Sequence, residues 1–168
     1  MKDRPSKIDY DGLISCAKGE MFGKGNPQLP MPPMLMFDRI LEISDNAGKA
    51  LKGHVVADFK IMPSHWFFTC HFQGDPVMPG CLGLDALWQL TGFNLGWRGM
   101  KGKGRALGVG EVKFSGMVTP STSVVTYNVE FTRVIDRKLK IGLADGVMLA
   151  DGKEIYKVSD MRVGLFRE

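Results

Sequence analysis

The run from Cys81 to Trp97 constrains the fold of this chain more than any other stretch. Its apolar side chains point in nearly all directions around a helix axis. The strongly polar positions in the run are Asp85, Gln89, Thr91 and Asn94. A helix that is apolar all round is a buried helix, and these residues would span roughly 25 Å, enough to cross a small domain. Pro79 and Gly80 directly precede the run and suit the start of such a helix.

The rest of the chain is dominated by strand-like patterns. The segments 37–43, 50–59, 105–114, 124–134, 139–149 and 154–164 predict strands, and Asp151-Gly152 predicts a hairpin turn between the last two. The aromatic run Trp66–Phe68 is also β-prone. Asp9–Glu20 is typical of a short amphipathic helix, and residues 23–33 predict a proline-rich structured loop. The expected fold class is therefore α+β, with one long buried helix wrapped by an antiparallel sheet of about six strands.

Composition narrows the class of protein. At 168 residues the chain is most simply one domain, 1–168, that is large enough to bury a core. Three cysteines without metal-type spacing indicate a reducing compartment, and the N-terminal stretch has no apolar core typical of a secretory signal. No apolar run approaches the ~20 residues of a membrane helix. We therefore expect a cytoplasmic protein that does not associate with membrane.

Residues 71–90 contain a histidine and a carboxylate, the two groups that general acid–base catalysis needs. A lone histidine such as His71 is often structural. Asp85 has apolar neighbours, and an unpaired buried carboxylate is costly, so it is either a structural hydrogen-bond acceptor or a functional residue. A partly exposed helix position is the alternative. Gln89 follows one turn later on the same face, where its amide can donate to Asp85.

The predicted helix start adds a third chemical feature. Gly80 and Cys81 would present free backbone N–H groups, which with the helix dipole attract a developing negative charge, as in an oxyanion hole. A plain helix start explains Pro79-Gly80 equally well.

Two other chemistries compete with acid–base catalysis. A zinc site would draw on His65, Cys70, His71 and Cys81, but these residues lack C-x-x-C spacing. Cys81 paired with His71 could act as a nucleophile, although a thiol at a helix start is also a common small core residue.

A basic segment lies near the end of a predicted strand. Its four cations are Arg133, Arg137, Lys138 and Lys140. Such runs are usually solvated turns, but they can also dock an acidic partner, and the formal net charge of +4 permits one. The segment lacks the interleaved aromatic residues typical of single-strand nucleic-acid binding, so no nucleic-acid partner is expected.

The sequence HFQGDPVMPGCLGLDALWQL at 71–90 closely resembles the signature of the bacterial 3-hydroxydecanoyl-[acyl carrier protein] dehydratase/isomerases. The resemblance covers nearly the whole chain. It includes KGEMFG at 18–23, PQLP at 27–30, GKGRALGVGEVKF at 102–114, GLADG at 142–146 and SD-x-x-VGLF at 159–166.

The resemblance implies a hot-dog fold and a homodimer whose active sites lie at the subunit interface. It implies that His71 of one subunit and Asp85 of the other are the catalytic pair. Related dehydratases without isomerase activity usually carry glutamate at the acid position, so Asp85 favours the bifunctional branch. No metal or cofactor is implied, and the substrate would be carried by acyl carrier protein.

The expected reaction starts from a (3R)-3-hydroxyacyl thioester. Neutral His71 would take the C2 proton and Asp85, protonated in an apolar setting, would protonate the departing hydroxyl. The Gly80 N–H would polarise the thioester carbonyl and Gln89 would orient Asp85. The expected residues around the substrate are Gly80, Cys81, Gln89, Val77 and Phe72, with Met78, Leu84 and Trp88 as further candidates.

Three alternatives remain at the level of sequence. The protein could be a dehydratase without isomerase activity, a hot-dog acyl thioesterase, or an acyl-binding protein without turnover. A passive lipid pocket would have no reason to place His71, Asp85 and Gln89 together.

Overall fold

The computed structural model describes residues 4–167. Its α-helices are α1 (Tyr10–Ala17) and α2 (Gly80–Trp97), and a 3₁₀ helix spans Trp66–Thr69. The strands are β1 (Arg39–Ser44), β2 (His54–Lys60), β3 (Lys103–Gly108), β4 (Glu111–Phe114), β5 (Val124–Asp136), β6 (Lys140–Ala150) and β7 (Lys153–Phe166). No helix within these residues is long and apolar enough to cross a membrane.

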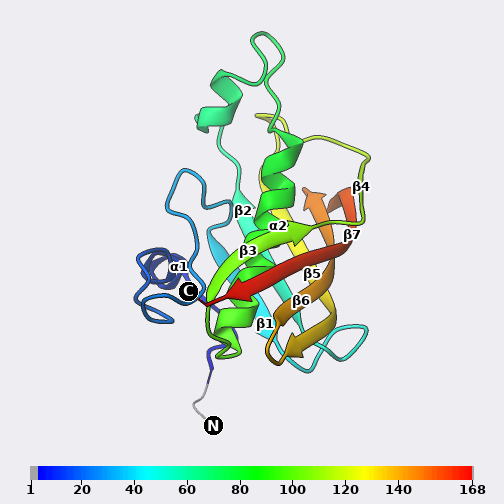
Figure 1. Ribbon diagram of the computed structural model, residues 1–168. Helices are drawn as coiled ribbons and strands as arrows, with labels where there is room; N and C mark the ends of the chain where they lie inside the picture. Colours follow the sequence, from blue (N-terminus) through cyan, green and yellow to red (C-terminus); the bar gives the residue numbers. More distant parts are fainter. Residues whose placement is uncertain (1–3, 168) are drawn as a thin grey trace.

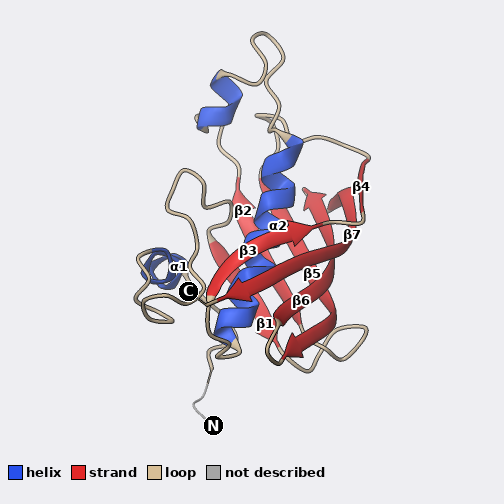
Figure 2. Ribbon diagram, viewed as in Figure 1, coloured by secondary structure: helices blue, strands red, loops and turns tan. Residues whose placement is uncertain are grey.

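The strands form one antiparallel sheet in the order β1-β2-β5-β6-β7-β3, and β4 pairs with β7. The sheet curves around α2, as Figures 1 and 2 show. Alternation along β5 buries Val125, Tyr127, Val129 and Phe131 on one face. The long helix wrapped by an antiparallel sheet is thus confirmed.

The hairpin turn between β6 and β7 is also confirmed. Asp151 has a φ of 47° and Gly152 a φ of 82°. Two successive positive φ values are what a tight two-residue hairpin turn requires, because its backbone twist matches that of the flanking strands.

Helix α2 approaches the sheet closely at Gly83. A Cβ at this position would lie 2.5 Å from both Met148 Sδ and Tyr156 Cε2. No side chain fits at that separation, so a glycine at position 83 lets the helix lie this near β6 and β7.

The prediction that α2 is buried all round is wrong for the single chain. One stripe along the helix is only partly covered, and it comprises Cys81, Leu84, Asp85, Trp88, Gln89 and Gly92. Their spacing of three and four residues places them on one face. The opposite face packs against the sheet. The sequence alone could not separate the two faces, because Leu84 and Trp88 are as apolar as the buried positions.

Four other predictions need correction. Trp66–Phe68 forms part of the 3₁₀ helix rather than a strand, and Phe67 stacks there against His65. The predicted strand 105–114 is divided into β3 and β4, which makes seven strands in the described residues rather than about six. The first helix ends at Ala17, and β2 begins at His54. Asp9 is not within α1 but caps it, accepting a hydrogen bond from Gly12 N at 2.9 Å.

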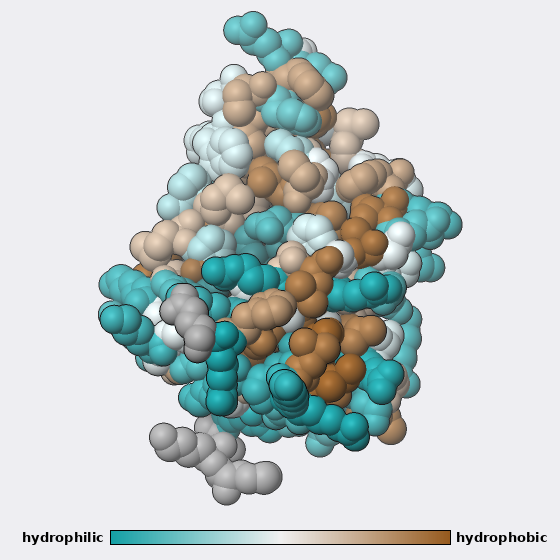
Figure 3. Space-filling view, in the orientation of Figure 1, coloured by the Kyte–Doolittle hydropathy of each residue, from teal (hydrophilic) through white to brown (hydrophobic). Residues whose placement is uncertain are grey.

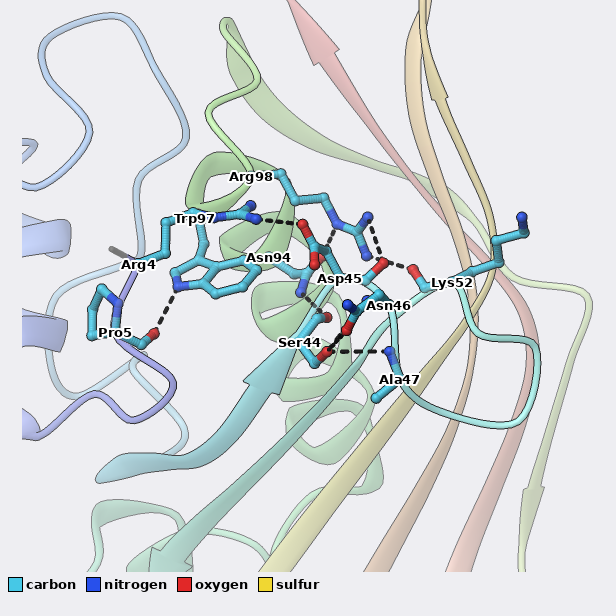
Figure 4. Close-up of polar contacts among 10 residues, drawn as sticks. All are labelled: Arg4, Pro5, Ser44, Asp45, Asn46, Ala47, Lys52, Asn94, Trp97 and Arg98. Atoms are coloured by element: carbon cyan, nitrogen blue, oxygen red, sulfur yellow. Dashed lines mark hydrogen bonds and ion pairs between the residues drawn. The ribbon is translucent and has the colours of Figure 1, made fainter. Parts of the chain in front are cut away.

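The C-terminal end of α2 is fixed by a polar cluster, which Figure 4 shows. The Trp97 indole donates to the Pro5 carbonyl at 2.8 Å, and the Arg4 guanidinium lies over the indole ring and pairs with Asp45. Asn94, which is fully buried, accepts from Arg98 Nε at 2.6 Å. The cluster therefore ties the N-terminal segment and the β1–β2 loop to the helix.

Replacing Arg98 with alanine should destabilise the fold by about 2–4 kcal/mol. The half-buried guanidinium also donates to the Lys52 carbonyl at 2.5 Å, and burial lowers its pKa. Its loss would leave the side-chain oxygen of buried Asn94 without its donor. Denaturant unfolding measures the change, with Arg162→Ala as the matched control because Arg162 pairs with Asp160 on the surface. Equal midpoints for the two variants would contradict this role.

Candidate active site

The segment between β2 and α2 lies at the top of Figure 1. His71 belongs to this segment, between the 3₁₀ helix and α2. Its backbone N–H donates to the Phe67 carbonyl at 2.9 Å, and its carbonyl accepts from Val77 N at 2.8 Å. The ring Nδ1 lies 3.0 Å from the Val77 carbonyl oxygen. Because a carbonyl can only accept, this bond assigns the proton of a neutral ring to Nδ1. The lone pair then resides on Nε2, the arrangement a general base needs.

A cavity of about 560 Å³ lies beside this imidazole. It is lined by His71, Val77, Met78, Gly80, Cys81, Leu84, Val112, Phe114, Gly116, Met117 and Tyr156. Its walls are mainly apolar, which suits an acyl chain. Phe72 does not line this cavity; its ring is 56% exposed and packs on the His71 ring at 4.0 Å between centroids.

Helix α2 begins at this cavity. The predicted helix start at Pro79-Gly80 is confirmed, although Pro79 is the N-cap residue rather than a first-turn residue, and Gly80 is the first helical residue. The first N–H groups of a helix have no acceptor within the helix, and the dipole makes this end attractive to negative charge. The exposed Cys81 follows directly. The cavity thus places a possible base and two backbone donors around the same apolar space.

Asp85 lies further along α2 and is half-buried. Gln89 Nε2 donates to Asp85 Oδ2 at 2.6 Å, which confirms the predicted bond one turn apart. The Gln89 amide also donates to the Met34 carbonyl at 2.8 Å and accepts from Met36 N at 3.4 Å. These contacts anchor Gln89 to the segment that precedes β1, so the amide can hold the Asp85 carboxyl in one orientation.

The structure does not bring His71 and Asp85 into one cavity. Asp85 lines a smaller cavity of about 150 Å³ together with Trp88, Gln89 and residues of β3. We call His71 and Gly80 with their cavity the base half-site, and Asp85 and Gln89 with theirs the acid half-site. Within residues 4–167 each half-site has only one of the two titratable groups that the expected reaction uses.

The predicted docking residues gather near the β5–β6 turn. Arg133, Arg137 and Lys138 are exposed, whereas Lys140 is half-buried and pairs with Asp136. This turn adjoins the C-terminal end of α2, because Val134 and Asp136 share a cavity with Trp97 and Arg98. The docking residues therefore lie at the end of the helix opposite Gly80 of the same chain.

Sequence reasoning missed five residues that line the cavity of the base half-site, namely Val112, Phe114, Gly116, Met117 and Tyr156. Phe114 on β4 and Tyr156 on β7 are cross-strand partners, and their rings pack edge to face with centroids 4.6 Å apart. Phe114 ends the resembling stretch 102–114, but no local pattern assigns either residue to the cavity. Their positions depend on the register between β4 and β7, and alternation along β7 was the only available signal for the inward direction of Tyr156. Within residues 4–167, no group of three or more His, Cys, Asp or Glu side chains is arranged to hold a metal ion.

Comparisons with known proteins agree with this architecture. Among solved structures, the dehydratase heterocomplex ApeI:P from Xenorhabdus doucetiae is similar with a TM-score of 0.63 and 18% identity, covering 83% of this chain and 89% of that chain. The HP0420 homologue from Helicobacter felis has a TM-score of 0.55 and 13% identity, covering 100% and 94%. A hypothetical thioesterase with coenzyme A from Streptococcus pneumoniae has a TM-score of 0.53 and 16% identity, covering 77% and 85%. Because all three identities are below 25%, these similarities support a shared fold alone.

The family comparison is more specific. Residues 29–159 match the model of the FabA-like domain. This range contains α2 with Gly80, Asp85 and Gln89, the loop with His71, and β1 to β6. The chain therefore belongs to the FabA-like domain family, whose members have the hot-dog fold.

Proposed function

We propose that the whole chain is one dehydratase domain that acts on (3R)-3-hydroxyacyl thioesters of acyl carrier protein, chiefly the 3-hydroxydecanoyl thioester. It would release water to give the trans-2-enoyl thioester and would isomerise trans-2-decenoyl to cis-3-decenoyl thioester in unsaturated fatty acid biosynthesis. The observation that carries the proposal is His71, whose Nε2 is available as a base beside an apolar cavity and a helix N-terminus.

The dehydration is a proton transfer at each end of one bond. His71 Nε2 removes the proton from C2, which the neighbouring thioester acidifies, so the reaction requires neither a redox cofactor nor a metal. The C2 electron pair forms the C2–C3 double bond as the C3–O bond breaks. Protonated Asp85 donates to the departing hydroxyl, which leaves as water. The Gly80 N–H stabilises the charge that develops on the thioester oxygen.

Isomerisation uses the same groups on the enoyl product. His71 removes a proton from C4, the double bond moves to C3–C4, and a proton returns to C2. A cis product requires the acyl chain to bend within the cavity. Val77, Met78 and Leu84 line it near His71.

A second copy of the chain would complete the site. The partly covered stripe of α2 contains Asp85, and the cavity of the acid half-site is lined partly by β3, which ends the sheet on that side. Leu107, Phe114 and Met117 are exposed nearby, and Figure 3 shows hydrophobic residues on this side of the molecule. A homodimer through this edge would cover apolar surface and place the acid half-site of one subunit opposite the base half-site of the other.

The direct test is incubation of the purified protein with 3-hydroxydecanoyl thioester and separation of the products. The proposal expects trans-2-decenoyl and cis-3-decenoyl thioesters. The trans-2 product alone would reduce the function to dehydration. Released free thiol would instead indicate a thioesterase, and binding without any product would indicate an acyl-binding protein.

The exposed cations at the β5–β6 turn provide a prediction about the carrier. Reversing charge with Arg137→Glu and Lys138→Glu should raise KM for a carrier-protein substrate about tenfold at low salt, because these cations would no longer attract the acidic carrier protein. KM for a small thioester should change little. Lys18→Glu with Lys24→Glu is a charge-matched control on another exposed segment. An equal rise for both substrates would exclude this surface as the docking patch.

A further inference from the structure

Tyr156 has a hydroxyl that the proposed reaction does not yet use. The residue is only 2% exposed, and it lines the cavity of the base half-site. Among residues 4–167 the hydroxyl makes no hydrogen bond. Its oxygen is not among the fully buried polar atoms that lack a partner, so it remains accessible although the residue as a whole is nearly buried. An accessible donor on a residue that lines a cavity can bind a polar atom of a molecule in that cavity.

The hydroxyl lies close to the first helical N–H. A Cβ added to Gly80 would be 3.2 Å from the Tyr156 oxygen. Because a Cβ lies about 2.5 Å from its own backbone nitrogen, the hydroxyl oxygen is no more than about 5.7 Å from Gly80 N. One acceptor oxygen at about 2.9 Å from each of two donors can bridge up to about 5.8 Å. A single oxygen atom can therefore accept from both groups.

The surroundings keep this hydroxyl protonated and in place. Burial, and to a smaller extent Cys81, raises the pKa of Tyr156 to about 12, so the neutral form that can donate persists at neutral pH. The edge-to-face contact with Phe114 has an interplanar angle of 86° and restrains the ring. A restrained donor in a mainly apolar cavity needs little reorganisation as charge develops.

We propose that the Tyr156 hydroxyl is a second hydrogen-bond donor, beside the Gly80 N–H, to the carbonyl oxygen of a bound acyl thioester. The inference rests on the proposed function, because it assumes that a thioester occupies the base half-site. When His71 takes the C2 proton, negative charge moves to this oxygen. Both donors then bind the enolate-like state more strongly than the ground state. The pair also selects for substrates that carry a carbonyl at this position.

Tyr156→Phe tests the role because it removes the hydroxyl and keeps the ring. The variant should lower kcat for dehydration about 10- to 100-fold with a smaller change in KM, because the Gly80 donor remains. Tyr127→Phe is the matched control. Tyr127 is fully buried, its unpartnered hydroxyl lies within the core, and it does not line this cavity. Its variant should retain the parent kcat. Equal kcat values for the parent and Tyr156→Phe would overturn the proposal.

A spectroscopic measurement separates this inference from the proposed function. Saturated decanoyl pantetheine thioester, labelled with ¹³C at the carbonyl, cannot be dehydrated, and its carbonyl stretching band moves to lower frequency when the oxygen accepts hydrogen bonds. The shift on binding should be smaller in Tyr156→Phe and unchanged in Tyr127→Phe.

The possible outcomes are distinct. If the carbonyl shift depends on Tyr156 but the parent protein has no dehydratase activity, the donor role of Tyr156 is supported and the proposed function is overturned. If the parent protein is fully active and Tyr156→Phe changes neither the carbonyl shift nor kcat, the donor role of Tyr156 is overturned and the proposed function stands. Failure of the parent protein to bind the thioester would overturn both.

Discussion

Replacing His71 with alanine should lower kcat for dehydration of 3-hydroxydecanoyl thioester by about 10²–10⁴-fold. The reason is the loss of the base whose Nδ1–H is fixed by the Val77 carbonyl and whose Nε2 is left available. KM should change less, because the apolar cavity walls remain. Initial-rate kinetics with a small thioester measure the effect without any contribution from carrier-protein docking.

The control for this variant is His54→Ala. His54 lies on β2, pairs with Glu42 at 2.9 Å and does not line the cavity of the base half-site. Its replacement should leave kcat within about twofold of the parent value when the protein is folded. A His71→Ala protein that is folded and retains the parent rate would remove His71 from the mechanism.

The second large effect is expected for Asp85→Asn, with a loss in kcat of about 10²–10⁴-fold. Asparagine keeps an oxygen that can accept from Gln89 Nε2, so the local hydrogen bond can persist while the acidic proton is lost. The loss should therefore appear in kcat with little change in the stability of the fold. Asp11→Asn, an exposed change in the first turn of α1, is the control. Undiminished dehydration by a folded Asp85→Asn variant would contradict the assignment.

The parts of the fold that sequence predicted best are those set by local patterns. α2 was predicted from its largely apolar run, and the β6–β7 turn from Asp151-Gly152, because both depend on residues close together in the chain. Trp66–Phe68 was mispredicted because the β-propensity of aromatic residues reflects packing on a sheet surface rather than a backbone preference. Here Phe67 packs within a 3₁₀ turn instead.

The candidate site was predictable in its residues but not in its arrangement. His71, Gly80 and the Asp85–Gln89 bond follow from one continuous stretch, and the bond is present. Tyr156 lies beside Gly80 because β7 packs against α2, and the pairing of β4 with β7 adds Phe114; both are non-local properties. The uncovered stripe of α2 was hidden from sequence because apolar residues occupy both faces of the helix.

The separation of the two half-sites is central to this account. In one chain, His71 lies beside one cavity and Asp85 beside a different cavity. The face of α2 that contains Asp85 is only partly covered. If each active site combines half-sites of two subunits, two inactive variants can complement one another. A heterodimer of His71→Ala and Asp85→Ala chains would contain one site with both residues intact and one with neither.

The most direct measurement is therefore the dehydratase activity of His71→Ala and Asp85→Ala chains unfolded, mixed in equal amounts and refolded together. Random pairing gives half heterodimers with one intact site each, so about a quarter of the parent activity should return. Each variant refolded alone should remain inactive. If the mixture shows no more activity than the two separate variants while refolded dimers form, the two residues do not act across a subunit interface.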